Sequence, residues 1–558
     1  MNSKSMRRYS RGALAAMVML VVTAAAGCGG DDDGDDVAAA PDAAPVVTAD
    51  AAPVGTPDAA EVPETDAAVV VPDGAVLLPP DAEPVEPPDA APPDAMPATG
   101  ALRLVHAAPV AGPVDVYVVG SSVPLLANLA YGQASAYVAL PPGSVTLELR
   151  DAGALPSVAP LYTSDPIDVV ANGSVTAVAA GLLGSTTAAT QFRVTALVDG
   201  FETATPGHAR VRLVHGSYSL GTVGVDLGDD GIVEAGALER FAASDAAGYD
   251  VAAGGELPVA LIGSDAMHTR QGAFVVPAAM IAAGGDVYAV VTGLSNVRPR
   301  DPRGLVVLLV SAHSVTLAVR QNPTIYVLAV SPDAAGLDGF IGGTKVATNL
   351  TFGKLGSVRV APGAAGASLV LQATSAETAP SATPIATLST GPLAAGEQYL
   401  VVLSGMVGAA AGSDDALALH VYRDELPLAL DGNGRLRVVH AASGVGMIDV
   451  GRFSAGATPA WNDVGDFMAI APGAASAPAG TPLVDGTTPV PVNPGVREGG
   501  GAGGGTVLRF GSGAMMNTDR AFGVFAGAWA ATGTLKPPRY VLVKTAATAW
   551  TATVLTPL

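Results

Sequence analysis

This chain has little cysteine, few aromatic residues and few charged ones. Of its 558 residues, one is cysteine, 5% are aromatic and 14% are charged, whereas 49% are hydrophobic. One cysteine cannot form an intramolecular disulfide, so the folded domains depend on their hydrophobic cores for stability. Abundant apolar residues with few aromatics are typical of β domains rich in Val, Ala and Leu. The length leaves room for about three to five domains.

Basic residues are missing from one long segment and form no cluster after Arg11. Residues 29–100 contain 17 acidic residues and no Lys or Arg. Residues 101–558 contain 24 basic and 33 acidic residues, so their net charge is only −9 although the whole chain carries −22. Nucleic-acid binding requires a basic stripe that displaces counterions from phosphates. We therefore expect no nucleic-acid partner.

The first 26 residues have the pattern of a bacterial export signal. Residues 1–11 contain four basic residues and no acidic one, and residues 12–26 form an apolar run. A run of this length is too short to span a bilayer as a mature helix, but it suits the hydrophobic region of a signal peptide. We therefore expect the protein to be secreted across the inner membrane.

The single cysteine ends this signal. The sequence Ala-Ala-Gly-Cys at 25–28 resembles a bacterial lipobox, in which the cysteine is lipidated and becomes the new N-terminus, although Ala25 stands where Leu is usual. We expect residues 1–27 to be a lipoprotein signal peptide and Cys28 to carry the lipid. Gly29, not Asp, follows the cysteine, which resembles sorting to the outer membrane. The alternative is an ordinary secretory leader with an incidental Cys28.

Residues 28–100 lack the composition of a folded domain. They consist largely of Ala, Pro, Asp and Val in short irregular cycles. Proline removes backbone donors and the acidic side chains repel one another, so we expect a disordered, extended tether without a core. At roughly 3.1 Å per residue, about 70 residues would reach on the order of 200 Å at most. The acidic run at 31–36 lacks the spacing and the terminal Glu of a calcium loop, which favours a solvated run of charge.

One phrase recurs four times at the spacing of a small β domain. It reads Arg-Leu-Val-His-Ala at 103–107, Arg-Leu-Val-His-Gly at 212–216 and Arg-Val-Val-His-Ala at 437–441, with a fainter copy, Tyr-Val-Leu-Ala-Val, at 326–330. The anchor positions His106, His215, Ala329 and His440 are 109, 114 and 111 residues apart. A fixed period of this length indicates one domain repeated in tandem, because solenoid repeats are much shorter.

Within each period, short β-prone runs alternate with turns rich in Pro, Gly and Asn. Several short strands at a spacing of roughly 8–12 residues indicate a sandwich or a barrel. We expect an all-β protein with four tandem Ig-like, Greek-key β-sandwich domains at 101–200, 208–311, 314–424 and 434–558. The fourth is divergent, and its loop at 498–505 is nearly all glycine. That loop lacks the Lys-Ser/Thr of a phosphate cradle, which favours a mobile connection.

Strand alternation decides how the recurring His is interpreted. Alternate residues face opposite sides, so the His side chains should point with their apolar neighbours toward the core, while the arginines of the phrase point the other way. An Asp follows each anchor by 9 to 11 residues, at Asp115, Asp226, Asp338 and Asp449. We interpret His106, His215, His440 and these four Asp as structural hallmarks.

The alternative is a catalytic or metal-binding His–Asp dyad that uses Asp115, Asp226 or Asp449. Against it, Asp338 persists where Ala329 replaces the His, and no Ser or Cys nucleophile recurs at a fixed offset. We therefore expect no catalytic residue, no bound metal and no cofactor.

Two further signals are weaker. The sequence Asp-Leu-Gly-Asp-Asp-Gly at 226–231 is similar to the start of a calcium loop but fails at its third and twelfth positions, which favours a turn. Trp461, Trp529 and Trp550 all lie in the fourth period. They are candidates for a platform that binds sugars or other flat ligands, although buried core positions are favoured.

These motifs together resemble a bacterial family of domains of unknown function, DUF4397. The resemblance rests on Arg-Leu/Val-Val-His-Ala-Ala, a following Val-Asp-Val strand, Asn-Leu-x-Tyr/Phe-Gly and a Pro-Gly turn. It is fullest over 101–199, partial over 314–405 and 434–455, and weaker over 208–310. It implies secreted or cell-surface β-sandwich domains in tandem, with the His and Asp positions as hallmarks and with no activity to transfer.

We expect a lipid-anchored protein of the bacterial cell envelope, at the outer membrane or the cell surface. Its expected role is non-enzymatic, either adhesion to or binding of an envelope polysaccharide or protein, or envelope structure; a scaffold without a small ligand fits equally well. The alternative is a secreted or surface hydrolase that acts on glycan or peptide with its site in a single divergent repeat. Such an enzyme would need paired carboxylates or a nucleophile in one cleft.

Overall fold

The computed structural model describes residues 98–265, 267–374, 379–381, 383–428, 432–453, 461–483, 490–499, 507–511 and 513–558. The expected signal peptide, Cys28, nearly all of the expected tether and most of the glycine-rich loop lie outside these residues. The described part consists of strands and turns with two short 3-10 turns, η1 (Ala278–Met280) and η2 (Gly465–Phe467). None of its helical segments is long and apolar enough to cross a membrane. The described part is therefore all-β, as the sequence predicts.

The first two repeats occupy residues 100–198 and 208–320. The strands of repeat one are β1 (Gly100–His106), β2 (Val114–Val118), β3 (Leu126–Leu129), β4 (Val138–Leu140), β5 (Gly143–Val145), β6 (Leu147–Asp151), β7 (Tyr162–Thr163), β8 (Ile167–Val169), β9 (Ser174–Ala180) and β10 (Arg193–Val198). The strands of repeat two are β11 (His208–His215), β12 (Val223–Leu227), β13 (Ala235–Leu238), β14 (Tyr249–Ala252), β15 (Leu257–Gly263), β16 (Arg270–Val276), β17 (Asp286–Thr292), β18 (Val306–Ser311) and β19 (Thr316–Arg320).

The last two repeats occupy residues 324–423 and 434–555. The strands of repeat three are β20 (Thr324–Ala329), β21 (Leu337–Ile341), β22 (Thr344–Leu350), β23 (Leu355–Arg359), β24 (Ser368–Ala373), β25 (Ala386–Ser389), β26 (Gln398–Ser404) and β27 (Ala418–Arg423). The strands of repeat four are β28 (Gly434–Ser443), β29 (Ile448–Phe453), β30 (Trp461–Asp463), β31 (Thr481–Leu483), β32 (Val490–Val492), β33 (Pro494–Glu498), β34 (Leu508–Arg509), β35 (Gly513–Met515), β36 (Arg520–Ala528), β37 (Arg539–Lys544) and β38 (Thr551–Leu555).

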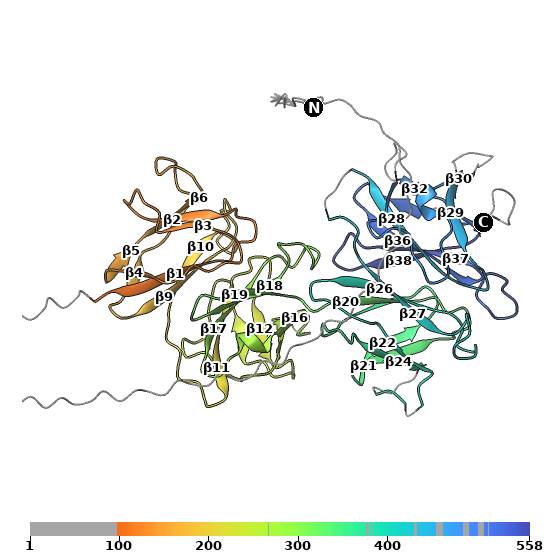
Figure 1. Ribbon diagram of the computed structural model, residues 1–558, viewed down its shortest axis with the longest axis horizontal. Helices are drawn as coiled ribbons and strands as arrows, with labels where there is room; N and C mark the ends of the chain where they lie inside the picture. The colour runs from red at the N-terminus through yellow and green to blue at the C-terminus, as the bar shows by residue number, and fades with distance from the viewer. Residues whose placement is uncertain are drawn as a thin grey trace, which may run out of the picture. The chain divides into compact units, whose positions relative to one another are not determined.

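All four repeats share one strand arrangement, in which a first sheet contains the recurring phrase and a second sheet contains the recurring Asp (Figure 1). The first sheets have the orders β10-β9-β1-β4, β14-β11-β17-β18-β19, β23-β20-β26-β27 and β31-β28-β36-β37-β38. The second sheets have the orders β3-β2-β6-β7, β13-β12-β15-β16, β22-β21-β24-β25 and β30-β29-β33-β34. In every first sheet, the strand of the phrase pairs parallel with a late strand, namely β9, β17, β26 or β36. The prediction of four tandem sandwiches is thereby confirmed.

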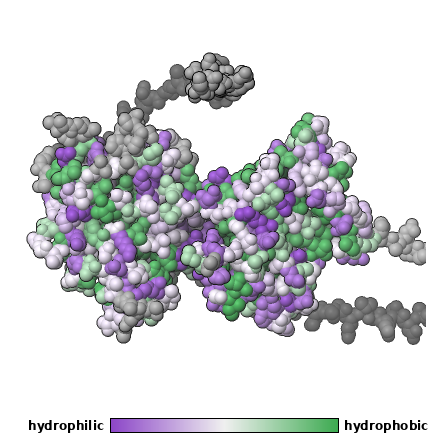
Figure 2. Space-filling view, turned by 180° about the vertical axis from the view of Figure 1, so that it is seen from behind, coloured by the Kyte–Doolittle hydropathy of each residue, from purple (hydrophilic) through white to green (hydrophobic). Residues whose placement is uncertain are grey.

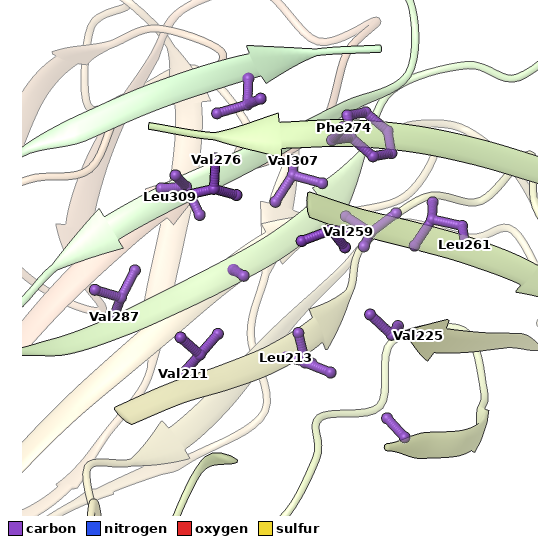
Figure 3. Close-up of a cluster of buried hydrophobic side chains, with 14 of the residues drawn as sticks. Val211, Leu213, Val225, Val259, Leu261, Phe274, Val276, Val287, Val307 and Leu309 are labelled. Carbon is purple, nitrogen blue, oxygen red and sulfur yellow. The ribbon is translucent and has the colours of Figure 1, made fainter. Parts of the chain in front are cut away.

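The two sheets of each repeat enclose a hydrophobic core. In repeat two, Val211 and Leu213 of β11 face Val225 of β12 and Val259 of β15 across the interior (Figure 3). Successive side chains of a strand alternate between its faces, so every second residue of the first strand enters this core. Equivalent clusters lie between the sheets of the other three repeats.

The outer faces of the first sheets are buried as well. One hydrophobic cluster joins Val105 of repeat one to Val214 and Val290 of repeat two. A second cluster joins Leu328 of repeat three to Val439 of repeat four. The repeats therefore pack in two pairs through their first sheets, and burial on both faces explains why these strands read as continuous apolar runs. Elsewhere on the face shown in Figure 2, hydrophobic residues are scattered among hydrophilic ones.

The boundary between repeats two and three differs from the expected one at 311 and 314. β19 pairs antiparallel with β18, from Val306 opposite Arg320 to Val310 opposite Thr316. The backbone ladder therefore assigns residues 316–320 to repeat two. The sequence shows this apolar run but not which strand it pairs with, because pairing depends on tertiary contacts.

Candidate functional site

The recurring His closes the loop between the first two strands of its repeat. The side chains of His106, His215 and His440 are 1%, 0% and 0% exposed. In each ring, Nε2 lies near the backbone oxygen of the glycine six residues ahead, at 3.0 Å from Gly112, 2.8 Å from Gly221 and 2.7 Å from Gly446, respectively. This burial agrees with the direction that strand alternation predicts. Each ring therefore braces one interior loop.

These contacts determine the protonation of the rings. A carbonyl oxygen only accepts hydrogen bonds, so Nε2 carries the proton and donates it. Nδ1 of His106 and of His440 accepts from the backbone N–H of the residue two positions ahead, at 3.3 Å in both cases. Burial lowers the pKa of all three rings, and the bond to the glycine opposes this effect. The rings are thus neutral at physiological pH.

The recurring Asp also binds backbone. The side chains of Asp115, Asp226, Asp338 and Asp449 are between 0% and 6% exposed. Their oxygens accept from backbone N–H groups of Asn128 (2.7 Å), Asp230 (3.2 Å), Asn349 (2.8 Å) and Ala469 (2.8 Å), respectively. Asn128, Asn349 and Ala469 have φ values of 52°, 48° and 54°, in the left-handed region that costs energy for any side chain. The Asp therefore holds a strained turn in three of the four repeats.

The His and the Asp do not meet as a dyad in repeat one. Nε2 of His106 donates to Gly112 and Nδ1 accepts from Ala108, whereas Asp115 accepts from Asn128 and from the N–H of Gly153 at 2.8 Å. A general base requires a free lone pair within reach of a substrate proton. Both groups are instead buried and bonded to backbone.

Repeat three replaces the His contact with a different one. Ala329 ends β20 at the place of the missing His and is 2% exposed. In the following loop, Asp333 accepts from the backbone N–H groups of Val407 (2.8 Å) and Gly408 (2.9 Å) and from the Ser331 hydroxyl (2.9 Å). The Asp333 carboxylate therefore binds this loop to the connection that follows β26. In the other repeats, the His ring instead binds a backbone oxygen within the loop itself.

The structure also places the residues of the two weaker sequence signals. Asp226 accepts from the N–H groups of Asp230 and Gly231, so its carboxylate at the end of β12 holds the turn at residues 228–231. Trp550 is 6% exposed and stacks on Tyr326 with a centroid separation of 4.1 Å, between repeats three and four. Trp461 and Trp529 are half-buried. Within the described residues, no group of three or more His, Cys, Asp and Glu side chains could hold a metal ion.

Sequence reasoning missed a cleft where repeats three and four meet. The cleft has a volume of about 810 Å³ and is lined by His420, Asp414 and Asp415, among others. Burial lowers the pKa of His420. Gly473 opposes the ring with a φ of 72°, and a Cβ there would lie 2.5 Å from Cε1 of His420. No repeated pattern marks these residues, because each occurs in one repeat only.

Sequence reasoning also missed a buried ion cluster that joins repeat two to repeat three. Asp424 is fully buried, and its oxygens lie 3.3 Å from Nη1 of Arg298 and 3.7 Å from Nη2 of Arg300. Burial raises the pKa of Asp424, and the two guanidinium groups oppose this effect. Asp424 and the two arginines are about 125 positions apart along the chain, so no local sequence pattern predicts their contact.

Comparisons with known proteins agree with the repeated motifs. The family model described as "Domain of unknown function (DUF4397)" matches residues 100–226 and 323–451. Each match covers one whole repeat and continues to the recurring Asp in the second strand of the next. No curated protein sequence matches this chain.

One similar solved structure is titled "The Bacillus anthracis TIE protein". It is 8% identical to this chain, with a TM-score of 0.11, and the match covers 55% of this chain and 50% of that one. This chain thus spans about half the length of that protein. The family model by itself identifies tandem DUF4397 domains in this chain, at residues 100–226 and 323–451.

Proposed function

We propose that this chain is a non-enzymatic protein of the bacterial cell envelope, anchored by a lipid on Cys28, whose paired sandwiches serve adhesion, binding or envelope structure. The main support for the proposal is that the recurring polar side chains stabilise loops and turns of their own domains. His106, Asp115 and their counterparts are buried and bonded to backbone. A repeated side chain that stabilises a loop in this way has a structural role, and we assign it no catalytic one.

The pairing of the repeats supports a mechanical or displaying role. Buried clusters join the first sheets of repeats one and two and of repeats three and four. Hydrogen bonds also cross the junction of repeats one and two, from Nη1 of Arg103 to the Ser311 oxygen (2.5 Å) and from the Thr292 hydroxyl to the Ala107 oxygen (2.5 Å). Large apolar contacts between domains restrict their relative motion. Such pairs suit a protein that holds a surface at a distance from the membrane.

Protease treatment of intact cells tests the envelope location. If the domains face the medium, an added protease should cut between residues 29 and 100 first and release fragments of 98–558 that resist further cleavage. The control is the same treatment after the outer membrane has been permeabilised. Release only after permeabilisation would assign the domains to the periplasm, and a protein found in the cytoplasm would overturn the proposal.

Detergent partitioning tests the anchor separately. A lipidated chain should enter the detergent phase of a two-phase extraction, and Cys28→Ser should move it to the aqueous phase because the single acylation site is gone. Ser10→Ala, a change of similar size in the leader, should leave the partitioning unchanged. A Cys28→Ser variant that stays with the detergent would contradict the lipid anchor.

The cleft around His420 favours one competing function, a hydrolase that acts on glycan or peptide. It places an imidazole and two carboxyl residues around one space, which is the combination that acid–base hydrolysis needs. Incubation of the purified chain with labelled envelope glycans and peptides distinguishes the two functions. Turnover that disappears in His420→Ala but persists in His313→Ala would support the hydrolase and overturn the non-enzymatic proposal.

A further inference from the structure

A polar pocket lies where repeats two, three and four meet. Its volume is about 430 Å³, within the range of pockets that hold small ligands. Repeat two contributes Arg270 from the start of β16, and repeat three contributes Arg359 from the end of β23 and Gln398 from the start of β26. Thr548 of repeat four completes the wall. Residues that are far apart in the sequence thus line one site.

The charge of this pocket is opposite to that of the chain. Its lining contains two arginines and no acidic residue, although residues 101–558 carry a net charge of −9. The two arginines lie close together, with Nη1 of Arg359 at 3.5 Å from the backbone oxygen of Arg270. Arg270 forms an ion pair with Asp229, whereas Arg359 has no carboxylate partner among the described residues. The guanidinium of Arg359 is therefore available to an anionic ligand.

Two buried amide side chains of the pocket lining have an acceptor oxygen without a donor. Gln321 and Gln398 are 5% and 1% exposed, and their Oε1 atoms have no hydrogen-bond partner among the described residues. The other end of Gln398 is held in place, because Nε2 donates to the Tyr326 hydroxyl (3.5 Å), which donates to the Thr548 oxygen (2.9 Å). Buried acceptors without a donor cost free energy. A ligand with hydroxyl groups would satisfy both amide oxygens.

We propose that this pocket binds a hydroxylated carboxylate, of the kind that a uronic-acid residue of an acidic polysaccharide presents. The carboxylate would pair with the guanidinium of Arg359, whose planar donors match its two oxygens. The sugar hydroxyls would donate to Oε1 of Gln321 and Gln398. This inference rests on the proposed binding role and names the chemical class of its ligand.

Calorimetric titration of the full chain with D-galacturonate tests the inference, with D-galactose as the uncharged probe. We expect galacturonate to bind with an association constant at least tenfold higher than that of galactose. Arg359→Gln should reduce the constant for galacturonate at least tenfold, and Arg359 is exposed enough for the variant to fold. Arg303→Gln, which removes an exposed arginine outside the pocket, should leave the constant unchanged.

A second variant adds a negative charge to the pocket and leaves Arg359 in place. Ser357 lies two residues before Arg359 on the same face of β23, and Ser357→Glu should occupy the guanidinium and abolish binding of galacturonate. Equal affinity for galacturonate and galactose, no binding of either, or full binding by both variants would overturn the inference. Each of these results would leave the envelope location standing, because protease treatment and detergent partitioning test that proposal independently.

Discussion

Arg437 ties the first strand of repeat four to the last strand of repeat three, because its Nη1 donates a 2.9 Å hydrogen bond to the backbone oxygen of Arg423. Arg212 does the same between repeats two and one, with a 2.7 Å bond to the oxygen of Val198. In both cases the acceptor lies fourteen residues earlier and ends the last strand of the preceding repeat. The Arg of the recurring phrase thus links two repeats, while the His three residues on braces its own.

Loss of this link should destabilise the second pair of repeats. Arg437→Met keeps most of the apolar stem but leaves the Arg423 oxygen without its donor, so the free energy of unfolding should fall by about 1–3 kcal/mol. Arg423→Ala is a matched control, because it removes an exposed side chain and retains the backbone acceptor. It should change the value by no more than about 0.5 kcal/mol. Urea denaturation measures both, and equal effects would refute a role of the link.

Removal of one buried imidazole should lower stability without a specific loss of binding. His440→Ala leaves the Gly446 oxygen unpaired and opens a cavity, which should reduce the free energy of unfolding by about 1–3 kcal/mol. His313→Ala, at an exposed position, should have little effect. Denaturation and binding of galacturonate are measured on the same preparations. A His440→Ala variant that is as stable as the wild type but has lost binding would contradict a structural role.

Acidification should destabilise the protein through its buried His residues. Burial lowers the pKa of His106, His215 and His440 in the folded state, so below about pH 6.5 the unfolded chain binds more protons than the folded one. Their contribution to stability is therefore complete above about pH 6.5 and is lost as the pH falls below it. Denaturation at pH 7.5 and pH 5.5 measures the difference, which His440→Gln should reduce. A wild-type protein equally stable at both values would contradict the assignment.

The recurring Asp should matter through both of its oxygens. Asp115→Asn replaces one acceptor with a donor that faces the N–H of Asn128 or of Gly153, so the free energy of unfolding should fall by about 1–3 kcal/mol. Asp151→Asn, at the exposed end of β6, makes the same chemical change without a buried bond and should be nearly neutral. Thermal unfolding compares the two, and a neutral Asp115→Asn would argue against the capping role.

Strand alternation placed the recurring His correctly, but it did not foresee that the opposite face is covered too. Val105 and Val214 lie between the core-facing positions, and both belong to the cluster that joins repeats one and two. A sign was present in the sequence, since a strand buried on both sides is apolar at every position. For this reason the alternation of polar and apolar residues in these strands was weak. The arginines of the phrase hid the burial of the second face, because a charged residue normally indicates an exposed position. Arg103 and Arg212 are 1% and 7% exposed because the neighbouring repeat covers them.

The sequence by itself determined the repeated unit, its all-β class and the inward direction of His106, because period and two-residue alternation are local properties of the chain. Only the tertiary structure decided which repeats pack together, that β19 completes repeat two, and that Arg359 shares a pocket with Gln398. These features join segments that are tens to hundreds of residues apart. Their partners are selected by shape and hydrogen bonding once the sheets have formed, and a residue that occurs in a single repeat leaves no periodic trace of its contact.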